Sequence, residues 1–252
     1  MNARARRVTA ASAAPLAQAS CAACSADECS ICRAAAGWSQ PTGTSLDVQQ
    51  TAHIVAARRI ICRDQDLHDV VPVICEGWAA SIIMLSDGSR QILSFLLPGD
   101  IVSAALFFDV RPDCLIEAIT DVHYRTLKRS EFRAALFRDT SLLEKLVKAW
   151  TEETIRADQL VVDLGRRTAD ERIARLIFNL AKRLVKRGMI ESETMEMDFP
   201  LRQHHIADAT GLTPVHVSKV LSEFRRSGLI NISDRSLTIL DPIGFRRIAQ
   251  MR

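Results

Sequence analysis

The chain has 252 residues, of which 48% are hydrophobic and 25% charged, and it carries a formal net charge of +3. This composition excludes a wholly disordered or fibrous protein, and the length predicts two domains or one large one. No stretch approaches the ~18 consecutive apolar residues that span a bilayer, so we expect a cytoplasmic protein without a membrane partner. The seven cysteines are an odd number in a long chain, which does not fit the disulfide framework of a small secreted domain.

Residues 1–45 are predicted to form an Ala-rich tail that contains four of these cysteines. Cys21, Cys24, Cys29 and Cys32 make two CxxC pairs, which suit an iron–sulfur cluster or tetrahedral zinc. In zinc ribbons such pairs are usually ~15–20 residues apart, whereas here four residues separate them. Reversible oxidation of the thiols is a third interpretation. The remaining cysteines are expected in the core; they are Cys62, Cys75 and Cys114.

Residues 46–135 are predicted to form a β-roll. Short apolar runs alternate with turn signals such as Asp87-Gly88 and Pro98-Gly99, and many short strands at regular spacing favour a small antiparallel barrel or roll. The predicted strands are Val70–Cys75, Ala79–Leu85, Gln91–Leu97, Cys114–Ile119 and Val122–Leu127.

Residues 136–164 are predicted to form a dimerisation helix that ends at Gly165. Its apolar positions recur at alternating spacings of four and three, which is the 3.5-residue seam of a helix that pairs with another helix. A helix packed on its own domain is the alternative. The predicted dimer seam consists of Leu143, Val147, Trp150, Thr154, Ala157, Val161 and Leu164.

Residues 165–252 carry 16 basic and 10 acidic side chains and are predicted to form a winged helix-turn-helix domain. Thr168 and Glu171 fit a capping box at the start of a helix that ends near Gly188. Further on, Gly211 suits a turn that needs a positive φ, and Thr213-Pro214 suits the start of a second helix. This pattern predicts a helix-turn-helix. Leu229–Ser233 and Leu237–Leu240 are expected to form the β-hairpin of a wing.

The second helix of this motif is expected to contact DNA. Its polar side chains can bond base edges or phosphates, and Val215 can contact a thymine methyl group. On the first helix, His204 and His205 are interpreted as a solvated or phosphate-contacting pair. The residues expected at the DNA are Arg202, Thr213, Pro214, Val215, His216, Ser218 and Lys219.

This α+β order of roll, dimerisation helix and winged helix-turn-helix resembles the CRP/FNR family of bacterial transcription regulators, in its FNR/FixK-like branch. The matching stretches are Leu96–Ile101, Ala118–Val122 with Lys128–Phe132, and Gly211–Lys219. The resemblance implies that the roll is a cupin-like, cyclic-nucleotide-binding-like sensor domain. It also implies a homodimer on a two-fold-related site in double-stranded DNA, which contacts RNA polymerase.

Two features of the sequence bear on the ligands that this family uses. Cyclic-nucleotide-binding members hold the ribose and phosphate with a Gly-Glu and an Arg-Ser pair. After Asp100 this chain has neither pair, because Arg111 is followed by Pro112, and Asp113 is acidic. We therefore expect no cyclic nucleotide. Oxygen-sensing members hold a [4Fe–4S] cluster with three N-terminal cysteines and one on the roll; the tail is similar, but the roll position corresponds here to Arg125.

The expected function is a DNA-binding transcription regulator that responds to redox state, oxygen or nitric oxide through a tail-bound iron–sulfur cluster. The fourth ligand is then either the fourth tail cysteine or one of the three roll cysteines. The same regulator gated by thiol oxidation, or by a small ligand or haem in the roll, is the main alternative. A dithiol oxidoreductase is less favoured, and the sequence has no P-loop, G-x-G-x-x-G, G-x-S-x-G or H-E-x-x-H motif.

Overall fold

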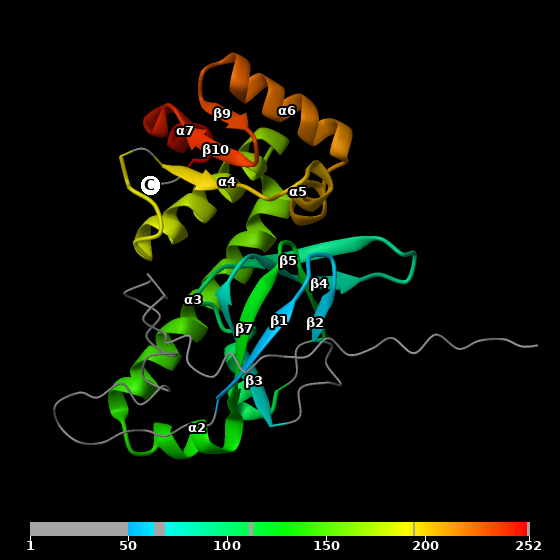
Figure 1. The fold of residues 1–252 in the computed structure, drawn as a ribbon. Coiled ribbons are helices and arrows are strands. Elements are labelled where there is room, and N and C mark those ends of the chain that lie inside the picture. The colour runs from blue at the N-terminus through cyan, green and yellow to red at the C-terminus, as the bar shows by residue number, and fades with distance from the viewer. Residues whose placement is uncertain (1–49, 63–68, 111–112, 194, 251–252) are drawn as a thin grey trace, which may run out of the picture.

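The computed structural model describes residues 50–62, 69–110, 113–193 and 195–250. Figure 1 shows a β-roll, a long helix α3 that runs beside it, and a helix-rich part at the far end of α3. This is the predicted α+β architecture.

The roll consists of two sheets whose neighbouring strands are all antiparallel. One sheet has the order β1-β7-β3 and the other β2-β6-β4-β5. The five strands that the sequence predicts are all present, each within one residue of its predicted ends. The strands are β1 (Gln50–Val55), β2 (Ile60–Cys62), β3 (Val70–Glu76), β4 (Ala79–Met84), β5 (Arg90–Leu96), β6 (Leu115–Ala118) and β7 (Val122–Lys128).

The predicted hairpin at Asp87-Gly88 joins β4 to β5. Gly88 has a φ of +83°, a left-handed conformation that glycine adopts without steric cost. The Asp87 carboxylate accepts hydrogen bonds from the backbone N–H of Ser89 at 2.8 Å and from its hydroxyl at 2.6 Å. This local side-chain bonding is the usual reason that aspartate begins a turn.

Three helices cover one side of the roll: η3 (Ala104–Phe108), α2 (Arg129–Leu136) and α3 (Thr140–Arg166). The Asp139 carboxylate caps α3 by accepting from the backbone N–H of Ser141 at 2.9 Å. The predicted end of this helix at Gly165 falls one residue before the observed end, because α3 continues to Arg166 and the backbone becomes extended at Arg167. An interior glycine costs a helix only about 1 kcal/mol relative to alanine, so packing at this junction can outweigh it.

The far end of the molecule contains four helices and a small sheet with the order β8-β10-β9. The capping box of Thr168 and Glu171 is confirmed, and Gly188 has a φ of +64° just after the helix. The wing hairpin is confirmed as β9 and β10, while β8 and α7 are additions that the sequence did not predict. The elements are α4 (Ala169–Lys186), β8 (Glu196–Asp198), α5 (Gln203–Thr210), α6 (Pro214–Arg226), β9 (Ile230–Ser233), β10 (Ser236–Ile239) and α7 (Pro242–Ile248).

Two apolar clusters form the core. One fills the roll and reaches α2 and the start of α3, where the ring of Phe107 stacks on that of Phe132 with 4.2 Å between centroids. The other fills the helix-rich part and continues into the β4–β5 side of the roll through Trp78, Ile92 and Phe95. The roll and the helix-rich part therefore share a packed apolar boundary.

Candidate nucleic-acid interface

The predicted helix-turn-helix is formed by α5 and α6. The turn residue Gly211 has a φ of +65°, and a Cβ at this position would lie 3.2 Å from a methyl group of Leu164. Glycine therefore serves both the backbone conformation and the close approach to α3. The Thr213 hydroxyl accepts from the backbone N–H of His216 at 3.2 Å, and Pro214 opens α6. Both predicted start signals of the second helix are confirmed.

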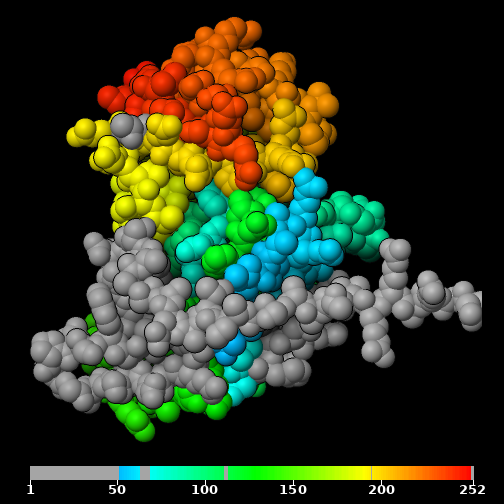
Figure 2. All heavy atoms as spheres, in the orientation of Figure 1, coloured from blue at the N-terminus to red at the C-terminus, as the bar shows by residue number. Residues whose placement is uncertain are grey.

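The outer side of α6 carries most of the predicted DNA contacts. Val215 is 80% exposed, whereas Val217 and Val220 are buried beneath the helix. Ser218 is half-buried. Figure 2 shows α6, in orange, uncovered on the outer surface at the end of the molecule opposite α2. The exposed members of the predicted set are Arg202, Thr213, Pro214, Val215, His216 and Lys219.

His205 departs from the prediction, because only its neighbour His204 is exposed. The residue His205 is 7% exposed, and its Nδ1 accepts from the backbone N–H of Arg202 at 3.1 Å. Burial, followed by the charges of His204 and Arg90, lowers the pKa of His205 to about 4. At neutral pH the ring is thus an uncharged group that stabilises the first turn of α5.

A cleft of 1230 Å³ lies between the roll and the helix-turn-helix. From the roll, Arg90 forms ion pairs with Glu117 of β6 at 3.1 Å and with Asp208 of α5 at 3.5 Å. The β4–β5 hairpin therefore contacts the first helix of the motif directly. Pro214 and Ser218 of α6 line the same cleft, so one edge of the second helix faces the roll while Val215 faces solvent.

The predicted dimer seam lies on the exposed side of α3. Leu142 and Leu146 are fully buried against the roll, whereas the adjacent Leu143 and Val147 are 40% and 52% exposed. Core contacts and seam thus occupy different faces of one helix. Six of the seven seam residues are exposed, and the seventh, Leu164, is half-buried. The seam is not wholly separate from the domain, since the Trp150 ring lies 5.6 Å between centroids from that of Phe108 in η3.

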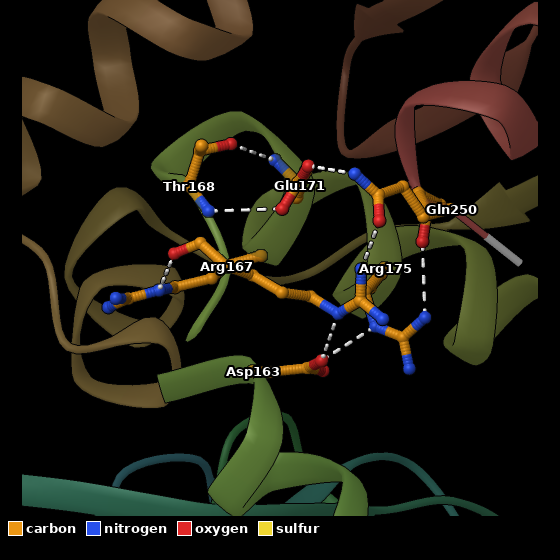
Figure 3. Close-up of polar contacts among 8 residues, drawn as sticks. Asp163, Arg167, Thr168, Glu171, Arg175 and Gln250 are labelled. Atoms are coloured by element: carbon orange, nitrogen blue, oxygen red, sulfur yellow. Dashed lines mark hydrogen bonds and ion pairs between the residues drawn. The ribbon is translucent and has the colours of Figure 1, made fainter. Parts of the chain in front are cut away.

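A polar network joins the end of α3 to α4 and to the end of the described chain (Figure 3). The Asp163 carboxylate accepts from Nε of Arg167 at 3.0 Å and from Nε of Arg175 at 2.7 Å. Arg167 also donates to the Gln250 side chain, and Arg175 to the carbonyl of Ala249, each at 3.1 Å. The junction between α3 and α4 is therefore held by charged hydrogen bonds that meet at Asp163.

A buried ion-pair group connects α4 to the roll. The Asp100 carboxylate, in the turn after β5, pairs with both Arg183 and Arg187. Arg183 also donates to the carbonyl of Phe95 at 2.9 Å, and Arg187 to that of Pro98 at 2.6 Å. Burial by itself would raise the pKa of Asp100, but the charges of the two arginines outweigh it and hold that pKa below its ordinary value. Burial lowers the pKa of Arg183 to about 10, so the guanidinium remains charged at neutral pH.

The predicted cluster ligands Cys21, Cys24, Cys29 and Cys32 lie outside the described residues, as does Arg111. Within the described ranges, no group of three or more His, Cys, Asp or Glu side chains is placed to hold a metal ion. The prediction of three core cysteines is confirmed for Cys62, while Cys75 and Cys114 are half-buried. None of the helices in the described part of the chain is long and apolar enough to cross a membrane.

Comparisons with known proteins agree with this arrangement of parts. A cyclic nucleotide-binding domain model matches residues 53–139, and a Crp-like helix-turn-helix domain model matches residues 171–248. The chain is 30% identical over 176 residues to the transcriptional activator protein FnrL of Cereibacter sphaeroides, covering 69% of this chain and 70% of that protein. It is 29% identical over 176 residues to the nitrogen fixation regulation protein FixK of Bradyrhizobium diazoefficiens, covering 70% and 72%.

Among solved structures, FixK2 from Bradyrhizobium japonicum matches with a TM-score of 0.67 and 26% identity, over 79% of this chain and 97% of that one. These relatives regulate transcription and are not enzymes. With the roll, α3 and the helix-turn-helix in the same order, the chain belongs to the CRP/FNR family of DNA-binding transcription regulators, in its FNR/FixK-like branch.

Proposed function

We propose that the protein is a homodimer that binds a specific, two-fold-related site in duplex DNA, contacts RNA polymerase there, and responds to redox state, oxygen or nitric oxide through a tail-bound iron–sulfur cluster. The observation that carries the DNA-binding part is the uncovered face of α6. There an 80%-exposed valine, Val215, stands beside the exposed donors of His216 and Lys219. An apolar group next to hydrogen-bonding side chains suits the thymine methyl and base edges of the major groove.

The dimer is supported by the apolar stripe that α3 presents to solvent. Val147, Trp150 and Val161 are 52%, 46% and 72% exposed, and contiguous exposed apolar surface of this kind marks an interaction site. A 3.5-residue repeat on one helix favours a second helix of the same kind as its partner. Two copies related by a two-fold axis would present two α6 helices to successive major grooves.

The DNA contacts can be tested on a duplex selected from a random library with the wild-type protein. His216→Ala should weaken binding to that duplex by about 1–3 kcal/mol and relax its sequence preference. Lys219→Ala should weaken binding to all sequences and reduce the slope of log K against log salt by about 1. Lys182→Ala, an exposed lysine on α4, is the matched control. If both α6 variants bound like this control, the recognition role of α6 would be wrong.

The redox part of the proposal rests on the four tail cysteines and on membership of the FNR/FixK-like branch. A [4Fe–4S] cluster, when bound by thiolates, supplies a centre whose redox state and integrity depend on oxidants. Full-length protein purified without oxygen should contain iron and acid-labile sulfide and show broad absorption near ~400 nm. The absence of both iron and sulfide from such protein would show that it holds no cluster.

Paired substitutions separate this input from the alternatives. Replacing Cys21 and Cys24 with serine should abolish the response of DNA binding to air. The same change at Cys75 and Cys114 tests whether either of these roll cysteines supplies the fourth ligand. A response that survives in the first pair would favour a small ligand or haem in the roll. A response that occurs without iron and is reversed by a dithiol would favour oxidation of the thiols themselves.

A further inference from the structure

A cavity of 580 Å³ lies between β5 of the roll, α3 and α4, and it shares no lining residue with the cleft beside α6. Its lining residues come from these three elements and from the end of α5; they include Phe95 of β5, Ile155 of α3, Leu176 of α4 and Thr210 of α5. The roll, the long helix and the helix-turn-helix therefore share one cavity. Its volume is within the range of about 300–1,000 Å³ that is usual for small-molecule sites.

The walls of this cavity are mainly apolar, and their side chains differ in exposure. Phe95 and Leu180 are buried, whereas Leu93 and Ile155 are 39% and 48% exposed. Apolar surface therefore extends from the core to solvent within one cavity. A ligand with an apolar body that covered the two exposed side chains would remove this surface from water, which is favourable.

The cavity is also basic. Its basic residues are Arg156, Arg172, Lys182, Arg183 and Lys186, and its acidic residues are Glu152 and Asp163. Both carboxylates are already paired, that of Glu152 with Lys186 at 2.8 Å and that of Asp163 with Arg167 and Arg175. The remaining charge of the cavity is therefore positive, which favours a ligand with a negative group.

Three of these basic side chains have donors to offer a ligand. Arg156 is half-buried and Lys182 is exposed, and within the described ranges neither forms an ion pair. Arg183 donates with its terminal nitrogens to the carbonyl of Phe95 and to Asp100, but its buried Nε has no hydrogen-bond partner among the described residues. A buried donor without a partner is unfavourable, so an acceptor on a ligand would stabilise it.

The cavity and the predicted dimer seam occupy different sides of α3. Leu164 is the one seam residue that lines the cavity. Gln159, which also lines it, follows the seam residue Ala157 by two positions and so lies about 200° around the helix from it. We therefore expect a second copy that pairs along the seam to leave the cavity open to a ligand.

We propose that this cavity binds a small amphipathic carboxylate, with its apolar body against Phe95, Ile155 and Leu176 and its negative group toward Arg156 and Arg183. The apolar walls select the body, and the unpaired basic groups select an anion over a neutral or cationic head. Such a ligand contacts the roll, α3 and α4 at once, so its binding stabilises the arrangement in which these parts form the cavity. This inference concerns binding by the folded chain and does not depend on the redox input proposed above.

Titration calorimetry of the full-length protein with decanoate and with decylammonium tests the site, because the two probes have chains of equal length and heads of opposite charge. Decanoate should bind at least about tenfold more tightly than decylammonium. Ile155→Glu removes apolar surface and adds a negative charge, so it should weaken decanoate binding by more than about tenfold. The matched control is Val162→Glu. Val162 lies one heptad later on α3, is 49% exposed and does not line the cavity, so this variant should bind decanoate like the wild type.

A second variant tests the charge alone. Arg156→Gln should weaken decanoate binding by about threefold to fivefold, as expected for the loss of one partly exposed ion pair, and should not weaken the binding of decylammonium. If Ile155→Glu does not keep the urea midpoint of the wild type, Arg156→Gln decides the test. Unchanged affinity for decanoate in either folded variant, equal affinities of the wild type for the two probes, or no binding of decanoate would overturn the proposal.

Discussion

Replacing Asp100 with asparagine removes the negative charge that Arg183 and Arg187 share where α4 meets the roll. The Asp100 side chain is 8% exposed, and those of the two arginines are 17% and 16% exposed. The carboxylate also accepts from the backbone N–H of Leu97 at 2.7 Å. Removing one member of a buried ion pair leaves the other charge uncompensated and costs about 3–5 kcal/mol. Because asparagine retains one acceptor oxygen, we expect a loss near the lower end of that range, about 3 kcal/mol.

The direction of the Asp100 pKa adds a dependence on pH. In the folded protein this pKa lies below its ordinary value of 3.8, so the unfolded chain binds the proton more readily. The stabilisation is therefore complete above the unfolded-state pKa and is lost as the pH falls through the folded-state pKa. The difference in stability between wild type and Asp100→Asn should be constant from about pH 5 to pH 8 and should narrow in stronger acid.

Urea unfolding followed by circular dichroism measures this difference, with buried Trp78, at the boundary of the two parts, as a second probe by fluorescence. Asp87→Asn is the matched control, because its carboxylate caps an exposed turn, and it should cost less than about 1 kcal/mol. A loss below about 1 kcal/mol for Asp100→Asn at pH 7 would show that the ion pairs do not fasten the two parts. A difference that stays constant in strong acid would show that the Asp100 charge is not its source.

Three further predictions concern the helix-turn-helix and α3. The free energy of unfolding of the wild type should fall as the pH drops from 6.5 to about 4, because the unfolded chain takes up a proton that buried His205 does not. Urea unfolding across this range should show that His205→Gln removes this dependence and that His204→Gln keeps it. The opposite result for the two variants would refute the assignment to His205. Thr213→Ala should lower the free energy of unfolding by about 1 kcal/mol, because it removes the hydroxyl that caps α6, whereas Thr213→Ser should be as stable as the wild type. Equal losses of stability in the two variants would show that the hydroxyl does not stabilise α6. Val147→Glu should convert the proposed dimer to a monomer in sedimentation experiments, while Lys145→Glu, off the seam, should not. A Val147→Glu variant that is still dimeric would show that the seam is not the interface.

Features that depend on neighbouring residues could be predicted from the sequence. The capping box at Thr168, the left-handed turn at Gly211 and the hairpin at Asp87 each arise from backbone bonding within a few residues. The ends of five roll strands were predictable to within one residue because turn signals bound each apolar run, whereas β1 and β2 were not predicted. The spacing on α3 predicted an apolar stripe but left open whether it packs on its own domain, and the structure shows that Val147 and Val161 are exposed.

Features that depend on distant residues could not be predicted in this way. Glu153 meets Ser103 across 50 residues, and Asp100 meets Arg183 across 83, so no local pattern marks either pair. His204 and His205 are equivalent as sequence, and only the rotation of α5 against the roll makes one a buried cap and the other a surface group. The early end assigned to α3 had the same origin, because contacts around Asp163 outweigh the weak helix preference of the glycine that follows it.

Three arginines in and directly after α4 hold this helix against two partners. Arg175 and Arg183 lie within α4, and Arg187 is its C-cap residue. The first holds Asp163 at the end of α3, and the other two hold Asp100 on the roll. A shift of α4 against α3 or the roll that breaks these ion pairs would leave a buried charge unpaired, which costs several kcal/mol. The two groups of ion pairs therefore hold α4 in place against both α3 and the roll.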